Sequence, residues 1–218
     1  GVNYWGGSSW PEFYGCTIMG NSASAEGGGV YLASDAAGLT MERCVVANNS
    51  SGAWAGGVTV GGNQGTSTIT NCTIVGNSGA ASGVEVFNGA TLVIQNSILW
   101  DNTPINFDDQ YGNGFAYYSD IGGGYDGEGN IDADPMFASA NAGDYTLTQD
   151  SPCKDAGTAD LDGDGVEDIT DYNGLAPDMG AFESEHGAPQ APEISISPTS
   201  LDFTVFPLHI VRKKIQFQ

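Results

Sequence analysis

The 218-residue chain carries 27 acidic and five basic residues, a net charge of −22, which excludes binding to nucleic acids and anionic membranes because phosphate groups need clustered Lys and Arg. Hydrophobic residues make up 40% of the chain, so it has enough apolar surface to fold and is not a disordered protein. Gly, Asn, Ser and Thr abound while helix-forming residues are scarce, which favours an all-β fold. No stretch approaches the roughly 20 apolar residues of a membrane helix, so we expect no membrane span in this chain.

A short motif recurs along the first half of the chain. Its copies are GCTIMGN, RCVVANN, NCTIVGN and NSILWDN. One column of the aligned copies steps by 28, 28 and 25 residues and holds Cys16, Cys44, Cys72 and Ser97. Five residues after this column every copy has an asparagine, namely Asn21, Asn49, Asn77 and Asn102. Repeats of this length indicate a solenoid.

Each repeat also contains short stretches in which apolar residues alternate with polar or small ones, such as 58–60, 84–86 and 92–94. This period of two predicts strands with one buried face. Three such strands per repeat, separated by Gly, Asn and Ser turns, predict an all-β solenoid, a three-faced parallel β-helix with coils about 4.8 Å apart. Inward residues then form ladders, and stacked asparagines bond to one another along the axis.

The paired elements TIMGN with GGGV, VVANN with GGV and TIVGN with SGV resemble the repeats of polymorphic outer membrane proteins and, more broadly, the pectate-lyase-like right-handed parallel β-helix superfamily. In those repeats the first element has the form (F/I)xxN. In this chain Ile or Val stands where the aromatic residue would be, so the resemblance is to the type of solenoid and not to one family. Between Ser119 and Glu183, the segments GNIDADPMF, DYTLTQDSPCKDAGT and DMGAFE resemble C-terminal coils of secreted, anchored bacterial β-helix proteins. This resemblance implies a secreted, extracellular or cell-surface protein.

The expected domain organisation follows from these segments. We expect residues 1–185 to form the β-helix, with about four to six coils, the later ones distorted by acidic loops. Because Gly1 falls in the middle of a repeat, we expect this β-helix to be truncated at its N-terminus. Residues 186–193 (HGAPQAPE) predict a Pro-rich linker. The segment APEISISPTSLDF resembles the first strand of an immunoglobulin-like domain, so residues 194–218 are the start of such a module or an irregular tail.

The segment DLDGDGVEDITD, residues 160–171, has the spacing of a calcium loop, with Gly165 at the sharp turn. The expected ligands are the carboxylates of Asp160, Asp162, Asp164, Asp168 and Asp171 and the carbonyl of Val166. Gly157 and Pro177 on either side argue against flanking helices, so we predict a calcium loop outside an EF-hand, similar to dockerin-type loops. We expect a structural ion that neutralises these carboxylates; the alternative is a solvated acidic turn.

The four cysteines are expected to be reduced. Three of them share one inward column, which suits small buried thiols, and a bridge between two would leave the third unpaired. Cys153 is expected to stand alone. His186 and His209 lie far from the cysteines in sequence, so no metal site is predicted there.

The sequence offers no convincing pair of catalytic residues. In residues 1–185 the basic residues are Arg43 and Lys154, and Arg43 is a weak candidate for the base of a polysaccharide lyase. A glycoside hydrolase needs two carboxylates about 5–9 Å apart. The acidic residues among the first hundred are Glu12, Glu26, Asp35, Glu42 and Glu85. Glu85 is expected to point outward, and the others fall in different parts of the coil. The pairs Asp108–Asp109 and Asp132–Asp134 are interpreted as turns and ion-binding loops.

Several aromatic residues are candidate stacking platforms for sugars, since a ring offers apolar contact with a polar edge. They are Trp5, Trp10, Trp54, Trp100, Tyr4, Tyr14 and Tyr31. The alternative is that they cover hydrophobic surface.

We therefore expect a non-catalytic extracellular module for adhesion or glycan binding, stabilised by calcium, with a polysaccharide or cell-surface glycan as its partner. The alternatives are a polysaccharide lyase or glycoside hydrolase of the pectate-lyase-like class, and a passive stalk that spaces other domains. An aromatic row on one face favours binding and a basic cluster favours a lyase; a face with neither favours the stalk.

Overall fold

The computed structural model describes residues 1–185 except 5–9, 26, 33–37 and 63–64. The predicted linker at 186–193 and the segment 194–218 lie outside the described residues. Trp5, Glu26 and Asp35 lie outside them as well.

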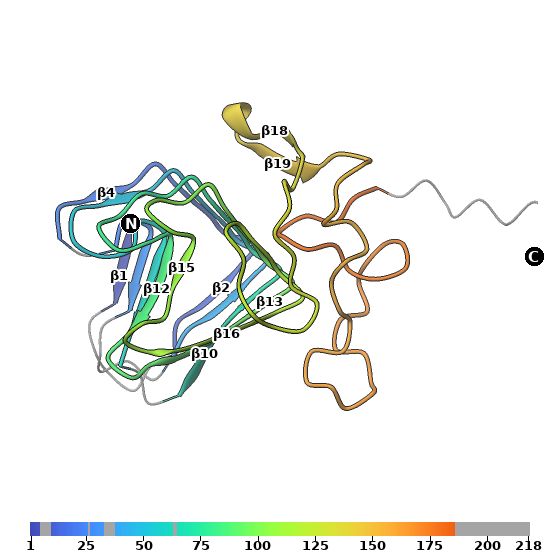
Figure 1. The fold of residues 1–218 in the computed structure, drawn as a ribbon, viewed down its shortest axis with the longest axis horizontal. Helices are drawn as coiled ribbons and strands as arrows, with labels where there is room; N and C mark the ends of the chain where they lie inside the picture. Colours follow the sequence, from blue (N-terminus) through green and yellow to red (C-terminus); the bar gives the residue numbers. More distant parts are fainter. Residues whose placement is uncertain (5–9, 26, 33–37, 63–64, 186–218) are drawn as a thin grey trace, which may run out of the picture. The chain divides into compact units, whose positions relative to one another are not determined.

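Three parallel sheets, each of five strands, form the three sides of the solenoid, and each coil of the chain adds one strand to each sheet in turn (Figure 1). The first sheet contains β1 (Val2–Tyr4), β5 (Val30–Leu32), β9 (Val58–Gly61), β12 (Val84–Phe87) and β15 (Phe107–Asp108). The second contains β2 (Glu12–Tyr14), β6 (Thr40–Glu42), β10 (Thr66–Thr70), β13 (Thr91–Gln95) and β16 (Asn113–Tyr117). The third contains β3 (Thr17–Met19), β7 (Val45–Ala47), β11 (Thr73–Val75), β14 (Ile98–Trp100) and β17 (Asp120–Ile121). The predicted all-β parallel solenoid is confirmed, and a short pair, β4 (Ser22–Ala23) and β8 (Ser50–Ser51), extends one corner.

The core lies inside the coil and is built from stacked apolar residues. In the third sheet, one residue of each strand points inward and pairs in register with that of the next strand. The resulting stack is Ile18, Val46, Ile74, Leu99 and Ile121. All five side chains are buried. Because the repeat places an apolar residue at the same position of every coil, stacking the coils produces a continuous core.

The cysteine column is a ladder of reduced thiols, as predicted. The backbone N–H of Cys16 donates to Sγ of Cys44, and that of Cys44 donates to Sγ of Cys72, both at 3.4 Å. Ser97 and Ser119 continue the column with hydroxyl acceptors. Burial raises the pKa of the Cys72 thiol, which keeps it protonated.

The asparagine column also forms the predicted ladder. Oδ1 of Asn77 accepts the backbone N–H and the side-chain amide of Asn49, each at 3.0 Å. The amide of Asn77 donates to the carbonyl of Val46 and to Oδ1 of Asn102, each at 2.9 Å. The turn backbone between the coils is therefore satisfied by side chains inside the protein.

The strands of the three parallel sheets end at Ile121, and one further parallel bridge stacks Ile131 on Asp120. Tyr125 closes this end of the core: its ring packs on Phe107 with centroids 5.0 Å apart, and its hydroxyl donates to Oδ2 of Asp109 at 2.7 Å. Apolar side chains that a further coil would have covered are thus covered by a capping loop.

Residues 137–184, which we call the cover, pack on the outer face of the third sheet instead of adding coils (Figure 1). The cover begins with an antiparallel hairpin, β18 (Phe137–Ser139) and β19 (Asp144–Leu147), joined by the 3-10 turn Ala140–Ala142. Its apolar contacts with the third sheet involve Val45, Ala47, Val75, Ile98 and Trp100 on the sheet and Phe137, Tyr145, Cys153 and Met179 on the cover. The outer face of the third sheet is therefore covered over β7, β11 and β14, whereas Thr17 and Met19 on β3 remain exposed. In the described part of the chain, no helix has the length and apolarity needed to cross a membrane.

Candidate functional site

Three of the predicted calcium ligands lie together at the acidic loop. The carboxylates of Asp160, Asp162 and Asp168 each provide an oxygen, and these oxygens lie within 4.8 Å of one another. Calcium binds oxygen at about 2.4 Å, so two of its ligands lie at most about 4.8 Å apart. The three carboxylates therefore fit around one calcium ion, and Asp162 and Asp168 are exposed to solvent, which leaves room for water ligands.

Backbone hydrogen bonds hold the loop in this shape. Asp160 accepts the N–H groups of Gly163 and Gly165 at 2.8 Å, and both glycines have positive φ values, 76° and 88°. Oδ2 of Asp168 accepts the N–H of Leu161 at 2.8 Å. The glycines are needed because residues with a side chain rarely adopt this conformation. No helix flanks the loop, as predicted.

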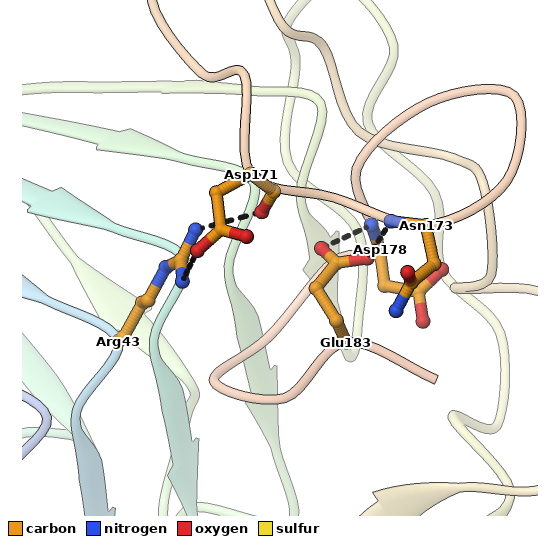
Figure 2. Close-up of polar contacts among 5 residues, drawn as sticks. All are labelled: Arg43, Asp171, Asn173, Asp178 and Glu183. Atoms are coloured by element: carbon orange, nitrogen blue, oxygen red, sulfur yellow. Dashed lines mark hydrogen bonds and ion pairs between the residues drawn. The ribbon is translucent and has the colours of Figure 1, made fainter. Parts of the chain in front are cut away.

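The group of close carboxylates does not include Asp164 or Asp171. Asp164 lies next to it: its N–H donates to Asp160 and Asp162, and its Oδ1 accepts the N–H of Val166. Asp171 forms an ion pair with Arg43, with 3.1 Å between Oδ2 and the guanidinium (Figure 2). The guanidinium also donates to the Asp171 carbonyl at 3.0 Å.

The acidic loop is fastened to the coil at the end of β13. The amide of Asn96 donates to the carbonyl of Thr158, and its Oδ1 accepts the N–H of Thr158, both at 2.8 Å. Nε2 of Gln95 donates to the carbonyl of Leu161 at 2.7 Å. The position of the loop relative to the second sheet is therefore set by direct side-chain contacts.

Arg43, the candidate lyase base, is bound to an acid of the cover. Its ion pair with Asp171 is the one found among the described residues. Beside it, Glu183 accepts the N–H groups of Asp178 and Asn173 at 3.0 and 3.4 Å (Figure 2). Burial raises the pKa of Glu183, while Arg43 acts in the opposite direction. The Glu183 carboxylate thus bonds two segments of the cover to each other, and the Arg43 guanidinium bonds the cover to the coil.

Glu85 points away from the coil interior, as predicted, yet it is only 6% exposed. Its carboxylate accepts the N–H of Ala55 at 3.2 Å, which places it beneath the turn that contains Trp54. Burial raises its pKa, and the charge of Asp108, its neighbour in register on β15, adds to this shift. The bond to Ala55 and the low exposure of Glu85 indicate that its carboxylate stabilises the turn.

Two of the predicted turns are present. Asp108 accepts the N–H of Gln110 and Asp134 accepts that of Met136, in each case two residues further along the chain, as turn-forming aspartates do. Asp132 instead accepts the N–H of Gly123, nine residues before it.

The outer face of the second sheet is uncovered, unlike that of the third. One outward column, in register, is Tyr14, Glu42, Thr70, Gln95 and Tyr117. The column beside it is Glu12, Thr40, Thr68, Val93 and Phe115. Every one of these side chains is exposed or half-buried. Aromatic rings stand at both ends of the face, with Trp10 and Tyr14 at one end and Phe115 and Tyr117 at the other.

The family model for the right-handed β-helix region matches residues 1–121. The chain belongs to the right-handed β-helix family. The match ends at Ile121, where the parallel sheets also end. No curated protein and no solved structure matches the chain. Since one fold of this kind carries many functions, the function of this right-handed β-helix has to be argued from its surfaces.

The predicted aromatic platforms separate into two groups. Trp10 and Tyr14 are exposed on the second sheet. Trp54 stacks on Phe87 with ring centroids 4.8 Å apart, Trp100 packs under the cover, and Tyr31 is buried. Tyr4 is half-buried and packs against the core.

Sequence reasoning missed Phe115 and Tyr117. Their signal is the pattern FAY, in which two aromatic residues flank the inward Ala116. The repeat motif weakens at this coil, so the strand was not predicted.

Proposed function

We propose that this right-handed β-helix is a secreted or cell-surface module that binds glycans without catalysis and is stabilised by calcium in its acidic loop. The observation that carries the proposal is the uncovered outer face of the second sheet, with aromatic rings at both ends and threonine hydroxyls between them. Rings stack on the apolar faces of sugars, while hydroxyl, amide and carboxylate groups bond to sugar hydroxyls.

The absence of catalysis is part of the proposal, and two observations support it. Glu85 is buried beneath a turn, and Arg43 is paired with Asp171. A glycosidase needs a protonated acid beside an ionised carboxylate.

Calcium would be held by Asp160, Asp162 and Asp168, with water or loop oxygens completing its six to eight ligands. The ion supplies positive charge that offsets the repulsion among three close carboxylates. Because the loop is bonded to Gln95 and Asn96, ordering the loop also fastens the cover to the coil.

Glycan binding is tested with immobilised polysaccharides and the purified protein. We expect retention on at least one glycan, no release of reducing ends from it, and at least tenfold weaker retention of Tyr14→Ala and Tyr117→Ala. Tyr111→Ala is the matched control, because Tyr111 is exposed outside the second-sheet face. Retention on no glycan contradicts binding and favours the stalk, whereas release of reducing ends contradicts the non-catalytic part.

The calcium site is tested by thermal unfolding with calcium and with a chelator. A ligand at a hundred times its Kd stabilises a protein by about 2.7 kcal/mol, so calcium raises the Tm of the wild-type protein. We expect Asp168→Asn to remove this rise and Asp164→Asn, which lies outside the carboxylate group, to keep most of it. Equal melting curves in both buffers would contradict the site.

A further inference from the structure

Three cysteines are stacked inside the coil, one on each of three successive turns of the solenoid. Cys16, Cys44 and Cys72 directly precede β3, β7 and β11, and these strands pair in register. Neighbouring strands lie about 4.8 Å apart, and the Cα atoms of a disulfide usually lie about 4.4–6.8 Å apart. The backbone therefore places each cysteine of the stack within disulfide range of the next one.

The sulfur of Cys44 lies against the backbone of Cys16. Sγ of Cys44 accepts the N–H of Cys16 at 3.4 Å. Sγ of Cys16 makes one long hydrogen bond, to the carbonyl of Tyr14 at 3.5 Å. A single torsion angle positions the sulfur of a cysteine, so a change of χ1 at Cys16 moves its Sγ at the cost of this weak contact alone.

The thiols of Cys44 and Cys72 differ in acidity. A hydrogen bond from the thiol of Cys72, and more weakly one from the backbone N–H of Cys16, outweighs burial and lowers the pKa of the Cys44 thiol. Burial raises the pKa of the Cys72 thiol. Because the thiolate is the nucleophile in disulfide exchange, Cys44 is ready to react and Cys72 is not.

Access to the stack also differs between its members. Cys16 is half-buried, whereas Cys44 and Cys72 are fully buried. The fourth cysteine, Cys153, is buried under the cover, where its thiol donates to the carboxylate of Asp120 at 3.1 Å. Burial raises the pKa of the Cys153 thiol as well. A small oxidant therefore meets the protein at Cys16, with the reactive sulfur of Cys44 directly behind it.

We propose that Cys16 and Cys44 form a disulfide when the protein meets a small disulfide oxidant such as oxidised glutathione, while Cys72 stays a thiol. The thiolate of Cys16 first attacks one sulfur of the oxidant, which forms a mixed disulfide and releases one glutathione. The thiolate of Cys44 then attacks the sulfur of Cys16 and releases the second glutathione. Two protein thiols are oxidised, one glutathione disulfide is reduced, and the two thiol protons pass to the two glutathione thiolates.

The disulfide fastens two coils of the solenoid to each other. Among the described strands, β3 pairs with β7 alone, so its attachment to the coil depends on one neighbour. A cross-link restricts the unfolded chain, and we expect the oxidised protein to melt about 5–10 °C above the reduced one. The bridge lies inside the coil and is independent of the proposed glycan binding.

The test equilibrates the folded full chain in buffers with increasing ratios of oxidised to reduced glutathione. The samples are quenched with acid, unfolded with an alkylating reagent, digested and analysed by mass spectrometry. Of the four cysteines, we expect Cys72 and Cys153 to be alkylated throughout. At oxidising ratios we expect the peptide that contains Cys16 to be linked to the peptide that contains Cys44.

Serine variants assign the bridge. Cys16→Ser and Cys44→Ser each abolish the linked peptide and the rise in Tm on oxidation. Cys72→Ser is the matched control, one coil further along the same stack, and it keeps both. Serine suits this position, because Ser97 continues the stack and accepts the N–H of Cys72 at 3.0 Å.

Several outcomes would overturn the proposal. Full alkylation of all four cysteines at the most oxidising ratio shows that no bridge forms. A glutathione that remains attached to Cys16 shows that Cys44 does not displace it. A bridge between Cys44 and Cys72, or between two chains, contradicts the proposed pairing. An unchanged Tm in the bridged protein contradicts the fastening of the two coils.

Discussion

Removing the amide at Asn77 tests whether the asparagine ladder stabilises the coil. Asn77 is fully buried and makes four hydrogen bonds, two through Oδ1 and two through its amide. Asn77→Ala leaves the N–H of Asn49 and the carbonyl of Val46 without these partners. A buried polar group without a partner costs about 1–3 kcal/mol, so we expect a loss of about 2–6 kcal/mol in the free energy of unfolding.

The matched control is Asn21→Ala, at the first coil. Its side-chain amide donates to Oδ1 of Asn49 and to the carbonyl of Met19, whereas its own backbone N–H keeps Asn49 as acceptor. Since the site is partly exposed, water replaces the lost bonds and we expect a loss of about 1 kcal/mol or less. Urea unfolding of both variants, followed by circular dichroism, gives the two values. Equal losses would refute the argument that burial makes the ladder important.

Three further predictions concern the cover and its contacts. Burial raises the pKa of Asp120 to about 6. Its contribution to the free energy of unfolding is therefore complete below pH 4 and falls by about 3 kcal/mol as the pH rises through 6. Asp120→Asn removes this pH dependence, which urea unfolding from pH 4 to pH 7 checks. Met179 is fully buried in the cover, so Met179→Ala lowers the free energy of unfolding by about 2–5 kcal/mol. The control, Leu175→Ala at an exposed position, changes it by less than about 0.5 kcal/mol. Equal losses of stability in thermal unfolding of the two variants would contradict a packed cover. The ion pair of Arg43 and Asp171 is exposed, so Arg43→Ala lowers the free energy of unfolding by about 1 kcal/mol or less. A double-mutant cycle with Asp171→Ala that gave an interaction energy of several kcal/mol would contradict this.

The coils were predictable because each coil repeats the same local pattern. An inward residue at Ile18 is followed 28 residues later by Val46 and again by Ile74, and the asparagine five residues after each cysteine marks the turn. Stacking makes every position contact its own equivalent, so a column in the sequence becomes a ladder in space.

The acidic loop was predictable in part. The spacing of Asp160, Asp162 and Asp168 predicts that their oxygens meet, because the backbone of a short loop with glycines brings them to one point. Asp171 satisfies the same spacing but lies against Arg43, 128 residues away in the chain. A competing long-range contact has no signature within the loop itself.

The sequence by itself determined the three-faced coil, its ladders and the acidic loop, since these depend on spacings within one repeat or one turn. Only the tertiary structure decided that the three parallel sheets end at Ile121 and that the chain later folds back over the third sheet. That choice rests on contacts such as Asn96 with Thr158, which occur once and 62 residues apart. The tertiary structure thereby decided that Trp100 is covered and that the outer face of the second sheet remains open. The reason is that the segment after the coils forms a single layer, which covers the outer face of one sheet and leaves that of another in solvent.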